Sequence, residues 1–429
     1  MQTIKVIIGA SFGDEGKGLA TDFFGAKAGV RDTVNVMTNG GPQRGHTVEL
    51  PDGARHVFKH FGSATFRGAA TYYSERFLVN PMEFLREYEA LSAIHRPPEA
   101  YMDPRCRWTT PWDMLVNQML LEKRGIHNSC GFGIWETVLR YRRGQGIRFH
   151  VLAAMNREDR LQYLRSLRDG YFVRRLRELG IAEQGSGAEQ ASSRELVSGI
   201  AQVLTSGTVQ SPAQNVRFRS TAGYLQEYFF SEDLLARFEE DCETLRYLCP
   251  MRDEDWLRMY RTVLFENGQG LLLDGNAKGE KLYTTPTTTG VGNVFRTVEN
   301  VFRGADVEVC YVTRSYLTRH GDGTMPGEIT DPRELATLLP GVSADGTNTG
   351  NRFQGDLRYG IIDTESLAER IRTDFAHCGG TVRNQYHPSV MVTHYNEFDG
   401  IDTARLTDEF GKLYLSDGRT VRDTEAVVA

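Results

Sequence analysis

A glycine-rich loop near the N-terminus contains the first residues that could carry chemistry. Residues 13–18, Gly-Asp-Glu-Gly-Lys-Gly, follow a short apolar run and precede a helix-compatible stretch. Glycines let backbone amides approach phosphate oxygens, and the first turn of the helix adds a partial positive charge. The loop departs from the usual nucleotide-binding motif, because Ser11 and Gly18 stand where that motif has a glycine and a hydroxyl residue. The pattern indicates a phosphate loop in which Asp14 is placed to act as a metal ligand or a base.

A second glycine-rich segment contains a histidine. Residues 40–47, Gly-Gly-Pro-Gln-Arg-Gly-His-Thr, place His46 in a loop between Gly45 and Thr47 and not on an apolar face. A lone histidine usually has no catalytic role. The loop position alone therefore assigns no role to His46, and the meaning of this segment depends on its pairing with the first glycine-rich loop.

The elements that position these loops follow a strand, loop, helix order. Apolar and β-branched runs predict strands at residues 4–8, 33–37, 57–61, 263–266, 271–274 and 307–313. Helices are predicted after Asn80 and Pro81 and over residues 112–124. Open α/β sheets bind ligands at the carboxyl ends of their strands. We predict one α/β domain spanning residues 1–429, built on a mainly parallel central sheet.

The middle of the chain changes character. Residues 151–260 are rich in Arg, Glu, Leu and Gln, with helical periodicity at residues 161–179 and 234–248. They predict a helical insertion within the domain. Residues 184–193 are polar and rich in Gly and Ser, and are the candidate flexible loop of this insertion.

Composition argues against several classes of protein. Fifty Lys and Arg residues against 56 Asp and Glu give a net charge of -6, which is unlike a nucleic-acid coat or a polybasic membrane binder. The six cysteines match no zinc-type spacing and no disulfide framework. No leader-like segment or long apolar run is present. We expect a cytoplasmic protein with neither nucleic acid nor membrane as partner.

The two loops, taken together and in this order, resemble those of the adenylosuccinate synthetase family. Further segments resemble the family in the same order: residues 129–148, 265–270, 273–274, 283–290, 318–323 with Pro326 and Glu328, 346–352 and 357–360. The resemblance is weakest between residues 150 and 260. It implies the P-loop-like fold of that family. It also implies a homodimer, in which Arg143 of each subunit would reach the partner's site.

The resemblance also implies an activity. The family joins L-aspartate to C6 of a 6-oxopurine nucleoside monophosphate and cleaves a nucleoside triphosphate. Because an oxo group leaves poorly, O6 is phosphorylated first, and the amine of aspartate then displaces phosphate. Asp14 matches the base that takes the N1 proton, and with the Gly45 carbonyl it would hold Mg²⁺. His46 matches the imidazole that stabilises the transferred phosphoryl group, and Lys17 and Gln269 complete the catalytic set.

The resemblance assigns the remaining contacts residue by residue. The nucleotide-binding positions it implies are Ser11, Gly13, Asp14, Glu15, Gly16, Lys17, Gly18, Gln43, Arg44, Gly45, His46, Thr47, Ser129, Arg143, Gln269, Thr284, Arg358 and Asn396. The aspartate-binding positions are Thr347, Asn348, Thr349, Gly350 and Arg352.

Two departures from the family pattern bear on specificity. Gln43 and Arg44 stand where the family reads the nucleotide with Asn and Ala. The guanine-reading segment Thr-Lys-x-Asp is replaced by residues 393–396, Thr-His-Tyr-Asn. A neutral amide such as that of Asn396 can pair with an adenine edge, so ATP or dATP is expected as the phosphate donor.

These departures resemble a branch found in phages that place 2-aminoadenine in DNA, whose members join aspartate to dGMP and form N6-succino-2-amino-2′-deoxyadenylate. If the chain is phage-encoded, it would act in the host cytoplasm. Many members of that branch carry a small residue where this chain has Asp14, so an IMP-using enzyme of AMP biosynthesis remains the alternative, with another purine-like acceptor as a third. From a different class, a non-catalytic nucleotide-binding regulator and a simple NTPase also stay open.

Overall fold

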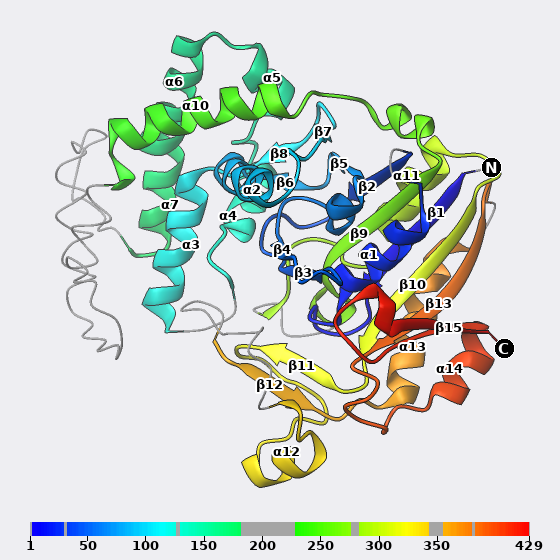
Figure 1. Ribbon diagram of the computed structural model, residues 1–429. Helices are drawn as coiled ribbons and strands as arrows, with labels where there is room; N and C mark the ends of the chain where they lie inside the picture. The colour runs from blue at the N-terminus through cyan, green and yellow to red at the C-terminus, as the bar shows by residue number, and fades with distance from the viewer. Residues whose placement is uncertain are drawn as a thin grey trace.

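A nine-stranded sheet forms the centre of the computed structural model, which describes residues 2–29, 32–125, 129–181, 228–275, 283–342, 355–379 and 382–428. The strands run in the order β15-β14-β13-β10-β1-β9-β2-β5-β7. Their bounds are β1 Thr3–Gly9, β2 Thr33–Met37, β5 Ala70–Tyr73, β7 Ala100–Met102, β9 Thr262–Gly270, β10 Asp306–Arg314, β13 Gln385–Thr393, β14 Lys412–Ser416 and β15 Thr424–Val428. Only β14 and β15 pair antiparallel among these neighbours. The predicted α/β fold with a mainly parallel sheet is confirmed (Figure 1).

Helices cover both faces of the sheet. Along β1 the side chains alternate: Ile7 packs in the cluster with α1, whereas Val6 and Ile8 pack in the cluster on the opposite face. The first face is covered by α1 (Lys17–Lys27) and the 3₁₀ helix η1 (Ser63–Arg67). The second is covered by α11 (Gly292–Val301), α13 (Thr364–Phe375) and α14 (Thr403–Phe410). Burial on both faces explains why the central strands are almost continuously apolar.

A helical region lies at the end of the molecule opposite the C-terminus (Figure 1). Its elements are α2 (Pro81–Ile94), α3 (Pro111–Arg124), α4 (Ile134–Arg142), α5 (Phe149–Ala154), α6 (Arg157–Ser166), the π-helix η2 (Leu167–Phe172), α7 (Val173–Glu178) and α10 (Glu232–Leu248). Asn80 and Thr110 cap α2 and α3 with side-chain hydrogen bonds, and a proline follows each cap. The described part of the predicted insertion is helical, and residues 184–193 lie outside the described residues.

Short elements complete the fold. Three two-stranded sheets pair β3 (His46–Glu49) with β4 (Arg55–Phe58), β6 (Leu78–Val79) with β8 (Arg107–Trp108), and β11 (Leu317–His320) with β12 (Leu357–Gly360). The remaining helices of the described ranges are α12 (Pro332–Leu338), η3 (Glu254–Met259), η4 (Leu271–Leu273), η7 (Ala376–Cys378) and η8 (Val421–Asp423). The prediction of a strand at residues 271–274 is wrong, because β9 ends at Gly270 and the chain turns there into a 3₁₀ helix.

Parallel pairing brings the functional loops to one edge of the sheet. The glycine-rich loop leaves the end of β1, the loop with His46 follows β2, and the segment 393–397 begins at the end of β13. The carboxyl ends of parallel strands meet at the same edge, so segments far apart in the chain share one site. Within the described ranges, no helix combines the length and the apolar character needed to cross a lipid bilayer.

Candidate active site

The loop after β1 is occupied by one of its own carboxylates. Glu15 Oε1 accepts hydrogen bonds from the backbone amides of Ser11, at 3.0 Å, and Gly13, at 2.6 Å. Its Oε2 lies 3.0 Å from Nζ of Lys17, which also donates to the Gly13 carbonyl oxygen at 2.6 Å. Both side chains are buried. The amides and the ammonium group that suit phosphate oxygens therefore surround one anionic position.

Two neighbouring strands hold this loop tightly. A Cβ on Gly270, at the end of β9, would lie 2.2 Å from the carbonyl oxygen of Ser11. On the other side, Gly16 has φ +91°, and a Cβ there would lie 3.0 Å from Cγ2 of Thr393. Glycine is required at position 16 because side chains rarely adopt this backbone conformation. The loop is thus fixed between the ends of β9 and β13.

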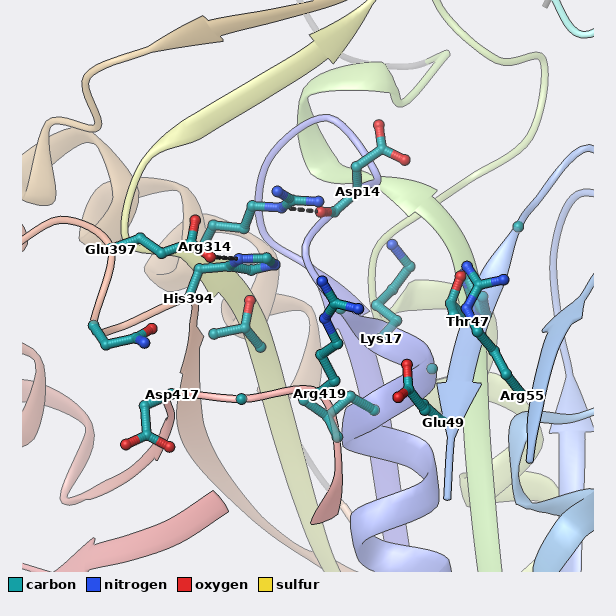
Figure 2. A pocket seen from close by; sticks show the side chains of 18 of the residues that line it. Asp14, Lys17, Thr47, Glu49, Arg55, Arg314, His394, Glu397, Asp417 and Arg419 are labelled. Atoms are coloured by element: carbon teal, nitrogen blue, oxygen red, sulfur yellow. Dashed lines mark hydrogen bonds and ion pairs between the residues drawn. The ribbon is translucent and has the colours of Figure 1, made fainter. Parts of the chain in front are cut away.

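A cavity of about 400 Å³ opens beside the loop (Figure 2). Its lining comes from the phosphate loop, the β3–β4 hairpin and the C-terminal third of the chain, and consists of Gly13, Asp14, Gly16, Lys17, Gly18, Leu19, Gly45, His46, Thr47, Glu49, Arg55, Arg314, Gly341, Thr393, His394, Asn396, Glu397, Asp417, Gly418 and Arg419. Figure 2 shows the side chains of Lys17, Arg55, Arg314 and Arg419 reaching into this region from four different segments. Such a set of cations suits a polyphosphate.

Asp14 lines this cavity, and two side chains from the C-terminal part of the chain approach it. Its backbone carbonyl oxygen accepts a hydrogen bond from Nε of Arg314 at 2.6 Å, and Nε2 of His320 lies 3.9 Å from its Oδ2. The backbone at Gly45 lines the same cavity. Among the described residues no three His, Cys, Asp or Glu side chains form a metal-ligand group. A carboxylate and a carbonyl completed by ligand oxygens fit Mg²⁺, which prefers few protein ligands.

His46 is held by a buried carboxylate. Its Nδ1 lies 2.5 Å from Oε1 of Glu266, which also accepts from the hydroxyl of Ser63 at 2.5 Å, while Glu266 Oε2 accepts from the Ser63 amide at 2.9 Å. Burial lowers the pKa of His46 to about 4 against the opposing effect of Glu266. Nε2 of His46 has no hydrogen-bond partner in the described structure. The neutral imidazole therefore donates from Nδ1 and presents Nε2 as an acceptor.

Arg44 keeps Glu266 ionised from inside the protein. Burial alone would raise the pKa of Glu266, but the charge of Arg44 and the contacts with His46 and Ser63 lower it to about 2. The Arg44 guanidinium donates to the carbonyl oxygens of residues 59, 60, 61 and 266 and to the sulfur of Met37. These contacts tie the His46 loop to β2 and β9. The nucleotide contact of the Arg44 side chain stays a prediction.

Gln43 and Gln269 meet on the other side of the loop. Nε2 of Gln43 donates to Oε1 of Gln269 at 3.1 Å, and Oε1 of Gln43 is buried with no partner among the described residues. Gln269 has φ +58°, where β9 changes its register against β1. Residues other than glycine are uncommon in this conformation and are frequent at functional sites. The pair forms a polar wall outside the 400 Å³ cavity.

A sequence model of the adenylosuccinate synthetase family matches residues 6–196 and 209–378. The chain belongs to the adenylosuccinate synthetase family. This is a family of C–N bond-forming ligases.

Curated members of the family are distant from this chain. The adenylosuccinate synthetase of Acaryochloris marina is 24% identical over 359 residues, which cover 81% of this chain and 67% of the relative. That of Desulforudis audaxviator is 27% identical over 85% of this chain and 72% of its own length. The relative from Borrelia duttonii aligns over 28% of its length, at 28% identity.

Two solved structures share the fold. A fully ligated adenylosuccinate synthetase from Plasmodium falciparum has a TM-score of 0.64 at 16% identity, covering 100% of this chain and 87% of that chain. The cyanophage S-2L succinoaminodeoxyadenylate synthetase, bound to dGMP and dATP as an energy donor, has a TM-score of 0.55 at 14% identity, covering 99% and 95%. At these identities the likeness establishes the adenylosuccinate synthetase fold.

Several positions implied by the family resemblance lie outside the cavity. Ser129 donates to Oδ1 of Asn117 at 3.2 Å, and the Thr284 carbonyl accepts from the indole of Trp135 at 3.1 Å. Arg358 pairs with Glu328 at 2.7 Å. Their nucleotide contacts stay predictions.

Other implied positions lie at the surface or are not described. Arg143 is exposed at 38% of its side chain and pairs with Glu178 at 2.7 Å. The aspartate-binding residues Thr347, Asn348, Thr349, Gly350 and Arg352 lie outside the described residues. Their contact with aspartate also stays a prediction.

Sequence reasoning missed part of the site of this adenylosuccinate synthetase family member. Arg314 and Glu397 line the cavity from β10 and from the segment after β13, and residues 417–419 close it from the loop after β14. Glu49 and Arg55 face each other across the β3–β4 hairpin. The signal available was positional: Glu49 and Arg314 end strands, Arg55 begins one, and Glu397 and residues 417–419 lie within four residues after one.

Proposed function

We propose that the chain is a ligase that joins L-aspartate to C6 of a 6-oxopurine nucleotide through a 6-phosphoryl intermediate. The observation that carries the proposal is that Asp14, Lys17 and His46 line one cavity. The phosphate loop alone would suit many nucleotide-binding proteins. A carboxylate and an imidazole in the same cavity supply the base and the electrophilic group that this two-step reaction needs.

The proposed chemistry uses each of these side chains at a stated atom. The Asp14 carboxylate accepts the N1 proton as O6 attacks the γ-phosphorus, and the nucleoside diphosphate leaves. The amine of aspartate then attacks C6, phosphate departs, and the amine loses a proton. An anionic phosphoryl group beside Nε2 of His46 favours a proton on that nitrogen. Glu266 then stabilises the resulting imidazolium through Nδ1.

Mg²⁺ is the cofactor we propose for this site. The Asp14 carboxylate and the Gly45 carbonyl would hold it, because both belong to the cavity lining and both offer oxygen ligands. When bound, the ion neutralises the charge of the triphosphate. Lys17 Nζ, at the centre of the phosphate loop, supplies a further positive charge.

We propose ATP or dATP as the donor. Asn396 lines the cavity where the family has a guanine-reading aspartate, and an amide can donate and accept at an adenine edge. His394, Asp417 and Arg419 line the same part of the cavity. The cyanophage S-2L protein of the same fold, described with dATP as its energy donor, supports this choice.

The acceptor we favour is dGMP, giving N6-succino-2-amino-2′-deoxyadenylate. The support is the altered loop tip, because Gln43 stands where the family has Asn and its amide donates to Gln269, and because the S-2L protein is described with dGMP. IMP is the second candidate. The position of Asp14 in the cavity favours it, since that residue is the base of IMP-using enzymes and many dGMP-using relatives lack it.

The decisive experiment measures phosphate release and product mass. Purified protein, Mg²⁺, ATP and L-aspartate are combined with dGMP, GMP or IMP, and each reaction is repeated without aspartate and with GTP in place of ATP. We expect product with dGMP, none without aspartate, and less with GTP. Asp14→Asn should abolish product, whereas Asp399→Asn, an exposed carboxylate outside the cavity lining, should not.

Each other outcome has a distinct meaning. Product with IMP alone would make the chain an AMP-pathway enzyme, and a strong preference for GTP would remove the proposal for Asn396. Phosphate release without aspartate would indicate a simple NTPase. Nucleotide binding with no product from any acceptor would indicate a regulatory protein.

A homodimer is the proposed assembly. The support is that the Arg143 side chain is exposed, pairs with Glu178 and does not line the cavity of its own chain. Light scattering at several concentrations tests this assembly. Arg143→Ala should raise the KM for the acceptor if the residue completes the partner's site, and a monomeric mass at all concentrations would contradict the proposal.

A further inference from the structure

A continuous chain of hydrogen bonds crosses the cavity wall from the segment after β13 to the phosphate loop. Nδ1 of His394 lies 2.8 Å from Oε1 of Glu397, and the hydroxyl of Tyr316 donates to Oε2 of Glu397 at 2.6 Å. Nη1 of Arg314 donates to the same Tyr316 hydroxyl at 3.2 Å. Nε of Arg314 then donates to the carbonyl oxygen of Asp14 at 2.6 Å. Figure 2 shows the two ends of this chain, Glu397 with His394 and Arg314 with Asp14.

The middle of the chain is buried and rigidly supported. Arg314 and Tyr316 are 5% and 2% exposed, and the guanidinium carbon lies 5.6 Å from the centre of the Tyr316 ring. Arg314 is the last residue of β10 and lies in register with Thr393, the last residue of β13. Between the two linked residues, Ser315 donates from its amide to Thr393 and from its hydroxyl to the carbonyl of His394. Buried donors and acceptors of this kind are costly to separate.

The His394 end of this hydrogen-bond chain shows signs of a functional constraint. His394 has φ +52°, a conformation that residues other than glycine rarely adopt. Its imidazole and the Glu397 carboxylate both line the cavity. Burial would raise the pKa of Glu397, but the bonds from His394 and Tyr316 lower it overall. The carboxylate is thus a charged acceptor that holds both partners.

The other end of the hydrogen-bond chain is Asp14, which is supported by a contact from outside its own loop. Asp14 follows Gly13, whose φ of +117° is available to glycine and to few other residues. Within the loop, the contacts are made by the side chains of Glu15 and Lys17, whereas the contact to the Asp14 carbonyl oxygen comes from Arg314 outside the loop. Because Arg314 binds the Asp14 carbonyl, the peptide plane after Asp14 is set by a residue of β10.

We propose that Arg314 is a positioning residue for Asp14, and that Tyr316 and Glu397 link the position of Arg314 to that of the segment 393–397. A nucleotide that fills the donor part of the cavity contacts this segment. Donor binding and the orientation of Asp14 are therefore coupled through four side chains. The catalytic consequence presupposes the ligase function proposed above, whereas the coupling of the two binding events does not.

The test substitutes the central hydroxyl. Tyr316→Phe removes the bridge between Arg314 and Glu397 and keeps the ring against which the guanidinium lies. The matched control is Tyr247→Phe, which removes the hydroxyl of an exposed tyrosine on α10, outside the cavity lining. Thermal unfolding establishes that each variant is folded. Glu397→Gln is the second variant and decides the matter if Tyr316→Phe does not fold.

Two readouts are compared. With saturating substrates, we expect Tyr316→Phe to lower kcat about tenfold, the effect of one hydrogen bond to a charged group, and to change the KM for the donor less than twofold. By calorimetry, a non-hydrolysable ATP analogue should tighten dGMP binding at least about fivefold in the unsubstituted protein and less than twofold in Tyr316→Phe. Tyr247→Phe should match the unsubstituted protein in both.

The outcomes separate this inference from the proposed function. An unchanged kcat with a raised donor KM would overturn it, because the chain would then only shape the donor cavity. Equal tightening of dGMP in both proteins would overturn it as well. If no acceptor yields product but tightening is seen and is lost in Tyr316→Phe, the coupling stands and the ligase function fails.

Discussion

The buried carboxylate of Glu266 allows a sharp test, because the chain contains a matched counterpart. Glu266 on β9 holds His46, and Glu308 on β10 holds Lys5, Lys412 and the hydroxyl of Tyr414 at 2.7 to 2.9 Å. Despite burial, their partners lower the pKa of both carboxyls from 4.5 to about 2. Replacing either by glutamine removes a charge of similar energetic weight, but only one of the two lies beside the cavity.

The magnitude follows from the shift in pKa. A difference of 4.5 against about 2 corresponds to about 3 kcal/mol of the free energy of unfolding at neutral pH, at about 1.4 kcal/mol for each unit. We expect Glu266→Gln and Glu308→Gln to lower that free energy by similar amounts, up to this value. This contribution is present above pH 4.5 and is lost as the pH falls towards 2, so the difference from the unsubstituted protein should shrink in acid.

Activity should separate the two variants. Glu266→Gln loses the charged acceptor at Nδ1 of His46, and a hydrogen bond to a charged group is worth about 1.5–3 kcal/mol, or about 10- to 150-fold in kcat. Glu308→Gln should keep kcat within about twofold. Urea unfolding at pH 7 and initial rates of phosphate release are the measurements. Equal loss of stability with unchanged kcat in Glu266→Gln would refute the catalytic role of this pair.

Three further predictions concern stability and the loop. Burial lowers the pKa of His46 from 6.5 to about 4 and that of His60 well below 6.5, so the unfolded chain takes up protons first and the free energy of unfolding should fall as pH falls from 6.5 to 4. The free energy of unfolding, measured by urea titration at several pH values, should fall less steeply with falling pH for His60→Gln than for the unsubstituted protein. An unchanged dependence on pH would contradict this assignment. Arg44→Ala should lower the free energy of unfolding by about 2–4 kcal/mol, because it leaves the buried Glu266 carboxylate without its countercharge. Unchanged stability with a raised nucleotide KM would instead favour the predicted nucleotide contact. Gly270→Ala should weaken nucleotide binding more than about tenfold, because its Cβ would lie 2.2 Å from a carbonyl oxygen of the phosphate loop, whereas Gly292→Ala, which meets nothing within 4 Å, should bind as the unsubstituted protein does, and equal binding by both would contradict the packing described.

Local sequence patterns predicted much of the fold. Residues 33–37 were predicted as a strand and form β2, and residues 112–124 were predicted as a helix and form α3 with the start one residue earlier. These predictions depend on periodicity and capping, which act over a few residues. The strand predicted at residues 271–274 failed because three consecutive leucines satisfy a strand pattern equally well when the chain packs its apolar side chains from a 3₁₀ turn.

The site could be predicted where short loop motifs supply the chemistry. Asp14, Lys17 and His46 follow from motifs, and the structure places them at one cavity. The backbone contacts of Arg44 were not predicted, because an arginine in a loop with a ligand-binding pattern gives no sign that its acceptors are backbone carbonyls elsewhere in the chain. Arg314 and Glu397 were missed for a related reason, since their meaning depends on the pairing of β10 with β13.

The carboxylate of Glu15 has a consequence for small anions. It already occupies the amides of Ser11 and Gly13 and the ammonium group of Lys17. A tethered group competes at a high effective concentration, on the order of millimolar or above. Free phosphate or sulfate that displaces Glu15 can gain only these same contacts, whereas a triphosphate also gains Arg55, Arg314 or Arg419 elsewhere in the cavity. We therefore expect Glu15 to compete effectively with the abundant inorganic anions of a cell, and to be displaced by a ligand with several points of attachment.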